Sequence, residues 1–281
     1  MHRILSQLAL SLFVSLLLIF SSSFNSKQET TPPPNIIVFL VDDMGLMDTS
    51  VPFLTDTNGN PVNFPLNDYY HTPNMEMLAS QGIRFVNFYA HSVCSPSRTS
   101  ILTGQNSARH GVTNWIRSEE NNRTEFGPKD WNWNGLNKNS TTLPLLLQQH
   151  GYKTIHVGKA HFGPFDSEGE DPLNLGFDIN IAGSSIGQPG SYLGTESFGH
   201  TGGNKSRAVP GLKKYHGQDI FLTEALTLEA NAAITQANQR ANLFSSICPT
   251  MLYMRLFTQI HALQKSIKTQ AILKKPRPMQ R

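Results

Sequence analysis

The chain has 281 residues, which is enough for one large domain or two small ones. Hydrophobic residues make up 38% and charged residues 15%, and this balance excludes a charge-rich disordered chain. The net charge of +3 arises near the C-terminus, where Lys265 to Arg281 include six of the 23 basic residues and no acidic one, so it does not indicate a nucleic-acid partner.

The N-terminus has the pattern of an export signal. A short basic start precedes an apolar run at residues 4–20, and small residues follow at 21–23. This order is typical of a secretory signal peptide, which we place at residues 1–24. An uncleaved membrane anchor is the alternative, because the run is long for a signal. Residues 25–34 are a polar, proline-rich linker, and the protein is expected to be secreted or periplasmic.

Apolar runs alternate with helical patterns along the rest of the chain. The continuous run at 36–41 predicts a strand buried on both faces. Residues 72–80 predict a helix with Thr72 as N-cap, Pro73 in the first turn and Gly82 as its stop. The same reasoning predicts strands at 83–89 and 153–157 and helices at 97–103, 142–150 and 222–239. This order predicts a parallel sheet covered on both sides, with ligands bound beyond the carboxyl ends of its strands.

Two adjacent carboxylates, Asp42 and Asp43, directly follow the first predicted strand. Side by side they repel each other unless a cation or water separates them. Their hard oxygen ligands suit Ca²⁺ or Mg²⁺. A solvated Asp-Asp turn is the plainer alternative, so the pair alone is modest evidence for a metal site.

Cys94 lies just before the helix predicted at 97–103. The free N–H groups and the dipole at a helix N-terminus favour an anion there and lower the pKa of a thiol. Arg98, four residues on, has a side chain that binds an anion at two points. A buried structural cysteine is the alternative, although the flanking residues are polar. The second cysteine, Cys248, is expected to have an unrelated role.

Around Cys94 the sequence resembles a known family. Cys94-Ser-Pro-Ser-Arg98, with Leu-Thr-Gly104 after it, resembles the signature of the type I sulfatases, which are arylsulfatase-like, formylglycine-dependent enzymes of the alkaline-phosphatase-like superfamily. The resemblance covers about residues 34–243. Further segments match the family in the same order, namely the strand and carboxylate pair at 34–45, a Gly-Lys-x-His segment at 151–163, residues 175–183, and Asp219 with the helix after it.

The resemblance implies an α/β fold of three layers, α/β/α, with a mostly parallel central sheet that is incomplete at its C-terminal side. Residues 35–243 would be the N-terminal part of the catalytic domain.

The resemblance also implies roles for particular residues. Cys94 would be oxidised by a separate maturation enzyme to formylglycine (3-oxoalanine), whose hydrate is the nucleophile. Asp42, Asp43 and the modified Cys94 would hold Ca²⁺, with Mg²⁺ as the alternative. Arg98 would hold the modified residue, Lys159 would bind a sulfate oxygen and His161 would be a secondary contact. Without the family, a solvated loop lysine is the plainer interpretation of Lys159.

The implied function is that of a sulfuric ester hydrolase acting on sulfate esters, with sulfated polysaccharides among the candidate substrates. A phosphatase or phosphodiesterase of the same superfamily is one alternative, although those enzymes use Ser or Thr as nucleophile. An inactive binder of sulfate esters is the other. Trp115, Trp131 and Trp133 either stack on sugar rings or pack a long surface loop.

Residues 244–281 do not match the family, whose members are usually longer and carry an Asp, an Asn and a catalytic His in later segments. If the codons of residues 247–256 are read one base earlier, they can encode Met-Ser-His-Tyr-Ala-Val-His-Ala-Pro. This peptide resembles the family's next motif. We therefore expect a frame shift near Leu243 or Phe244; a terminal helix with a basic face is the alternative. Such a truncated chain lacks later strands and metal ligands, so we expect poor folding and little sulfatase activity.

Overall fold

The computed structural model describes residues 33–119, 125–243 and 250–256. The chain divides into two compact units, Met1–Pro34 and Asn35–Arg281, and the fold below is that of the second unit. The signal predicted at 1–24 lies outside the described residues, as does Cys248. Among the helices of the described segments, none combines the length and the apolarity that a membrane crossing needs.

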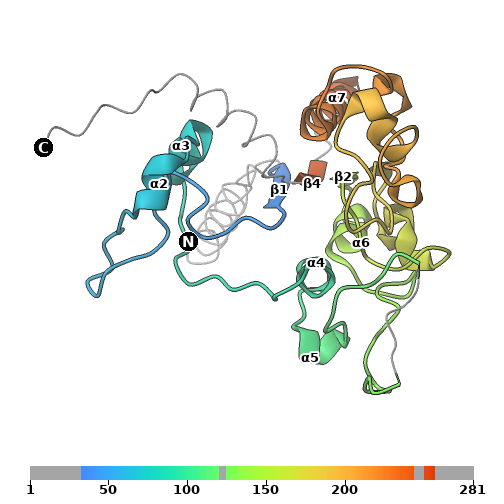
Figure 1. Cartoon of the computed structure of the whole chain (residues 1–281), viewed down its shortest axis with the longest axis horizontal. Coiled ribbons are helices and arrows are strands. Elements are labelled where there is room, and N and C mark those ends of the chain that lie inside the picture. Colours follow the sequence, from blue (N-terminus) through green and yellow to red (C-terminus); the bar gives the residue numbers. More distant parts are fainter. Residues whose placement is uncertain (1–32, 120–124, 244–249, 257–281) are drawn as a thin grey trace, which may run out of the picture. The chain divides into compact units, whose positions relative to one another are not determined.

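One parallel sheet forms the centre of the second unit (Figure 1). Its strands lie in the order β1 (Ile36–Val41), β4 (Thr250–Leu256), β2 (Lys153–Gly158) and β3 (Ile179–Ile181). Every neighbouring pair is parallel, and Leu252 of β4 is in register with Ile37 on one side and Ile155 on the other. The predicted parallel sheet is therefore confirmed, and the carboxyl ends of β1 and β2 lie at the same edge.

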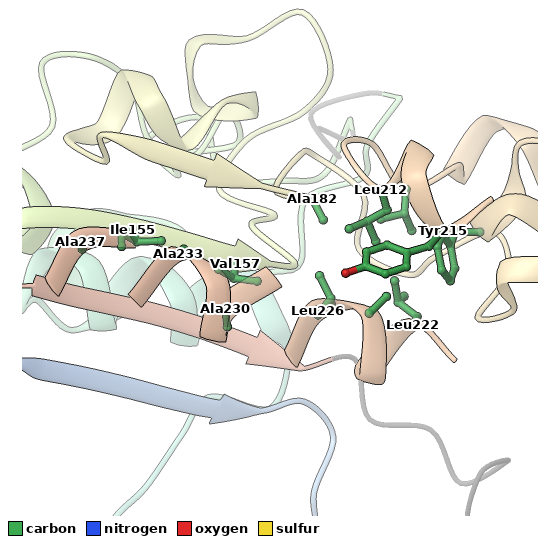
Figure 2. Packing of buried hydrophobic residues seen from close by; sticks show 13 residues of the cluster. Ile155, Val157, Ala182, Leu212, Tyr215, Leu222, Leu226, Ala230, Ala233 and Ala237 are labelled. Atoms are coloured by element: carbon green, nitrogen blue, oxygen red, sulfur yellow. The ribbon is translucent and has the colours of Figure 1, made fainter. Parts of the chain in front are cut away.

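Helix α7 (Leu222–Leu243) covers one face of the sheet, as Figure 2 shows. Its inward positions repeat with helical spacing at Leu226, Ala230, Ala233 and Ala237, and all are buried. Three small side chains in this stripe let the helix backbone approach β2 closely. They pack in the same cluster as Ile155 and Val157 of β2, two side chains without exposed surface.

Helices α4 (Cys94–Thr103) and α6 (Leu143–Gln149) cover the opposite face. Leu102 and Leu147 of these helices pack in one cluster with the alternate β1 residues Ile36, Val38 and Leu40. The three layers of the predicted α/β/α architecture are therefore present. The remaining helices are α2 (Pro65–Tyr69), α3 (Pro73–Gln81) and α5 (Ser107–His110), with 3₁₀ turns at Glu168–Glu170, Pro172–Leu175, Gly194–Gly199, Lys205–Arg207 and Lys213–Tyr215.

Two strand predictions differ from the structure. Residues 83–89 form no strand, and Ile83 and Phe88 are 85% and 79% exposed. A run of strand formers becomes a strand only when a neighbour pairs with its backbone, and no described strand does so here. Strand β1 is not buried on both faces, because Ile37 and Phe39 are more than half exposed. α7 contacts β2 and β4 instead, so among the described helices it covers the other strands rather than this face of the edge strand β1.

Most helix boundaries agree with the prediction to within a few residues. The important difference is α4, which begins at Cys94, three residues earlier than expected, and ends at Gly104 with a φ of 65°. Thr142 caps α6 through its side chain. Thr72 precedes α3, but its hydroxyl lies 2.7 Å from the Ser50 hydroxyl and does not cap the helix.

Candidate active site

Two parallel strands deliver oppositely charged residues to one edge of the sheet. Asp42 follows β1 and Lys159 follows β2, so both lie at carboxyl ends. The Nζ of Lys159 lies 2.6 Å from Oδ2 of Asp42, and both side chains are buried. Buried charges are stable only when they are paired, so this contact fixes both side chains at the sheet edge.

Arg98 connects these strand ends to helix α4. Its Nη1 donates to the carbonyl oxygens of Lys159 and Ala160, each at 2.8 Å, and its Nη2 lies 3.5 Å from Oδ2 of Asp42. The side chain has no exposed surface. In this arrangement the guanidinium holds the loop after β2 against α4, whereas the sequence pattern alone indicated a ligand for an anion.

Cys94 is the first residue of α4, and its Sγ lies 3.3 Å from Nδ1 of His161. The other ring nitrogen of His161, Nε2, bonds to the carbonyl oxygen of Ile116. A carbonyl only accepts, so Nε2 carries the proton of the neutral ring and Nδ1 faces the thiol as an acceptor. The side chain at position 94 is therefore held between a hydrogen-bond acceptor and the N–H groups of the helix N-terminus.

Burial sets the protonation of this site. Burial and the Arg98 charge lower the pKa of Lys159 to about 7. Burial, Lys159 and Arg98 hold the pKa of His161 well below its ordinary 6.5, so its ring is neutral at pH 7. Arg98, together with Lys159 in its protonated form, then faces one buried carboxylate, that of Asp42, and an electropositive site of this kind attracts an anion.

Asp43 is exposed and has a φ of 56°, a left-handed conformation that aspartate tolerates in turns. Its charge acts to raise the pKa of Lys159. Asp42 and Asp43 offer the hard oxygens that a divalent cation prefers, and so fit part of the shell of such an ion. Within residues 33–119, 125–243 and 250–256, no three His, Cys, Asp or Glu side chains gather to complete one.

The sequence did not predict the segment around Ile116 as part of the site. Besides binding His161 through its carbonyl, Ile116 donates its N–H to Oγ of Ser95, at 3.0 Å. Any residue type can make such backbone hydrogen bonds, so the sequence does not predict them and only the structure shows them. This segment closes over the start of α4 beside Cys94.

A second set of contacts that sequence reasoning missed holds the chain just before Cys94. The backbone N–H of Val112 donates to Nδ1 of His110, so Nε2–H of His110 donates to Oγ of Ser100, at 3.0 Å. Nε2 of His91 lies 3.2 Å from the same Ser100 hydroxyl. The backbone N–H of His91 also bonds Oγ of Ser97, at 3.0 Å. These bonds anchor the approach to Cys94 on the side of α4.

The relatives of this chain carry sulfatase names. It is 38% identical over 145 residues to arylsulfatase G of Rattus norvegicus, an alignment that takes in 51% of this chain and 22% of that protein. It is 33% identical over 161 residues to N-acetylgalactosamine-6-sulfatase of Mus musculus, with 57% and 26% covered. The chain thus spans about a fifth to a quarter of the length of these curated relatives.

Solved structures share the fold. The crystal structure of Ps i-CgsB superposes with a TM-score of 0.54 at 22% identity, covering 80% of this chain and 45% of that one. The structure of Ps i-CgsB in complex with k-i-k-neocarrahexaose gives 0.54 at 20% identity, covering 86% and 49%. The family model described as Sulfatase matches residues 34–246. This match includes Asp42, Cys94, Arg98, Lys159 and His161, and the chain belongs to the sulfatase family.

Proposed function

We propose that the protein containing this chain hydrolyses sulfate esters at Cys94. The observation that carries the proposal is the convergence of Arg98, Lys159 and His161 on the N-terminus of α4, where Cys94 begins the helix. An anionic sulfate group fits a site with two cations, a helix N-terminus and one buried carboxylate. Membership of the sulfatase family supports the same chemistry.

In this proposal Cys94 is oxidised to formylglycine by a maturation enzyme. One hydroxyl of its hydrate attacks sulfur and displaces the alcohol, and the second hydroxyl then expels sulfate and restores the aldehyde. The N-terminus of α4 stabilises negative charge on that side chain. Lys159, when protonated, donates to a sulfate oxygen, and His161 accepts a proton at Nδ1 from the group at position 94. Arg98 positions the loop that carries Lys159 and His161.

A divalent cation, Ca²⁺ or Mg²⁺, belongs to this proposal because Asp42 and Asp43 supply hard oxygens at the end of β1. It would supply positive charge to the sulfate oxygens when bound. Asp42 is already paired with Lys159 and Arg98, so its carboxylate stays oriented towards the site without the ion.

We place the substrates among sulfated carbohydrates. Two comparisons support this: one structural neighbour was solved with k-i-k-neocarrahexaose, and one relative is named N-acetylgalactosamine-6-sulfatase. The signal pattern at residues 1–24 supports export of the protein, which would bring it to sulfated polysaccharides outside the cell.

The test compares wild-type protein from a host with formylglycine-forming activity with the variants Cys94→Ala and Lys159→Ala. Because little sulfatase activity is expected of this chain, we expect turnover of 4-nitrophenyl sulfate that is low but above that of Cys94→Ala. We also expect calorimetric binding of the ester to Cys94→Ala that is lost when Lys159 is also replaced. Arg109→Ala, an exposed position on α5, is the control and should behave as wild type. Preference for 4-nitrophenyl phosphate would favour the phosphatase alternative, and binding without any turnover would favour the inactive binder.

A further inference from the structure

The segment from Trp115 to Glu119 lies across the start of α4. Ile116 ties it to the site, because its N–H donates to Ser95 and its carbonyl accepts from His161. Ser118 ties its other end, since its hydroxyl donates to the carbonyl of Ser185 at 2.8 Å. The segment is therefore anchored at two inward positions, one of which contacts the neighbours of Cys94.

Alternate residues of the segment face in opposite directions. Ile116 and Ser118 are only 2% and 5% exposed, whereas Trp115, Arg117 and Glu119 are exposed. From Trp115 to Arg117 this alternation matches that of an extended chain, so these two exposed side chains leave it on the same side. The Cζ of Arg117 lies 6.0 Å from the ring centroid of Trp115, which places an aromatic face and a guanidinium together.

A second arginine lies near the same segment. Arg207 approaches Glu119, with its Nε 4.0 Å from Oε1. Arg207 is therefore paired with a carboxylate, and the exposed face of the segment combines the Trp115 indole with the Arg117 guanidinium.

The other two tryptophans of this region have different surroundings. Trp131 and Trp133 pack against each other, with ring centroids 5.5 Å apart. Nε1 of Trp133 donates to the carbonyl of Pro128 at 3.1 Å. These contacts are those of a loop that packs on itself, and they distinguish the pair from Trp115, which adjoins the residue bonded to His161.

We propose that Trp115 and Arg117 form a saccharide subsite beside Cys94, in which the indole stacks on a sugar ring and the guanidinium binds an anionic group of the same or the next sugar. An aromatic face recognises the apolar face of a sugar, and a guanidinium pairs with sulfate at two points. The subsite would select sulfated oligosaccharides over small sulfate esters. It rests on the proposed function, since the bond to be cleaved must reach Cys94.

The test uses the full chain carrying Cys94→Ala, so that binding is measured without turnover. Calorimetry follows a sulfated galactan oligosaccharide, the same oligosaccharide after desulfation, and methyl sulfate. Trp115→Ala should weaken binding of the sulfated oligosaccharide about tenfold and Trp115→Phe much less. Arg117→Ala should weaken it about fivefold, flatten its salt dependence and leave the desulfated oligosaccharide unchanged. Trp131→Ala and Arg109→Ala are the matched controls, with binding as in the parent.

Equal binding of the sulfated oligosaccharide by the parent, Trp115→Ala and Arg117→Ala would overturn the subsite, as would an equal loss in Trp131→Ala. Methyl sulfate binding should not change in any of these variants, and a loss there would also contradict the proposal. Failure of the proposed function gives a different result. In that case the oligosaccharide binds through Trp115 and Arg117, but protein with an intact Cys94 never releases sulfate from it.

Discussion

Replacing Arg98 by methionine tests how the active-site loop is held. The change keeps much of the side-chain volume but removes the donors to the carbonyls of Lys159 and Ala160, both at 2.8 Å, and the partner of Asp42 at 3.5 Å. Each buried carbonyl that loses its donor costs about 1–3 kcal/mol, and breaking a buried charge pair costs about 3–5 kcal/mol. Because Lys159 still pairs with Asp42, we expect a loss of about 3–5 kcal/mol in the free energy of unfolding.

The assay is urea unfolding followed by tryptophan fluorescence, with Arg109→Met as the matched control. That exposed position should change the free energy of unfolding by less than about 0.5 kcal/mol. Arg98→Lys, which keeps the charge and a donor, should recover part of the loss. If Arg98→Met were as stable as the control, the bonds from Arg98 would not be what holds the loop after β2.

Three further predictions concern other parts of the chain. Burial lowers the pKa of His156 to about 3, so between about pH 6.5 and 3 the unfolded state binds more protons than the folded state. Lowering the pH from about 8 to 5 should therefore reduce the free energy of unfolding by about 2 kcal/mol. The variant His156→Gln should not show this reduction. A Cβ on Gly135 would lie 1.9 Å from the carbonyl oxygen of Phe162, so Gly135→Ala should lower the unfolding free energy by about 2–4 kcal/mol. Gly151→Ala, which also has a positive φ but open space around it, should cost only about 1 kcal/mol. For the frame shift expected in residues 244–281, coding DNA unable to spell the family's next motif in the alternative frame would end that hypothesis.

The strands and helices that local sequence specifies were predicted well. The β-branched runs that become β1 and β2, and the helices α3 and α6, depend on patterns within a few residues. Strand β4 was missed because residues 250–256 carry no clear period and gain their pairing from β1 and β2, distant in sequence. Residues 83–89 show the converse, since strong strand propensity without a described neighbour left them outside the sheet.

Asp42, Cys94 and Arg98 could be singled out from residue type and position, whereas Lys159 and His161 were proposed through the resemblance to the sulfatases. Asp42, Arg98 and Lys159 meet in one ion-paired group, and Cys94 meets His161. Their bonding could not be predicted, because the partners of Arg98 and His161 include backbone carbonyls, which every residue has. Residue type therefore indicates which side chains can do the chemistry, whereas their hydrogen-bond partners follow only from the tertiary structure.

Cys94 is proposed as the precursor of a formylglycine nucleophile, and the mass of the peptide that contains it tests this conversion. Protein is produced in a host with formylglycine-forming activity, digested, and the peptide containing residue 94 is identified. We expect the mass of formylglycine at this position, and an unmodified thiol in protein from a host without that activity. An unaltered cysteine in both preparations would show that Cys94 is not the precursor of the nucleophile.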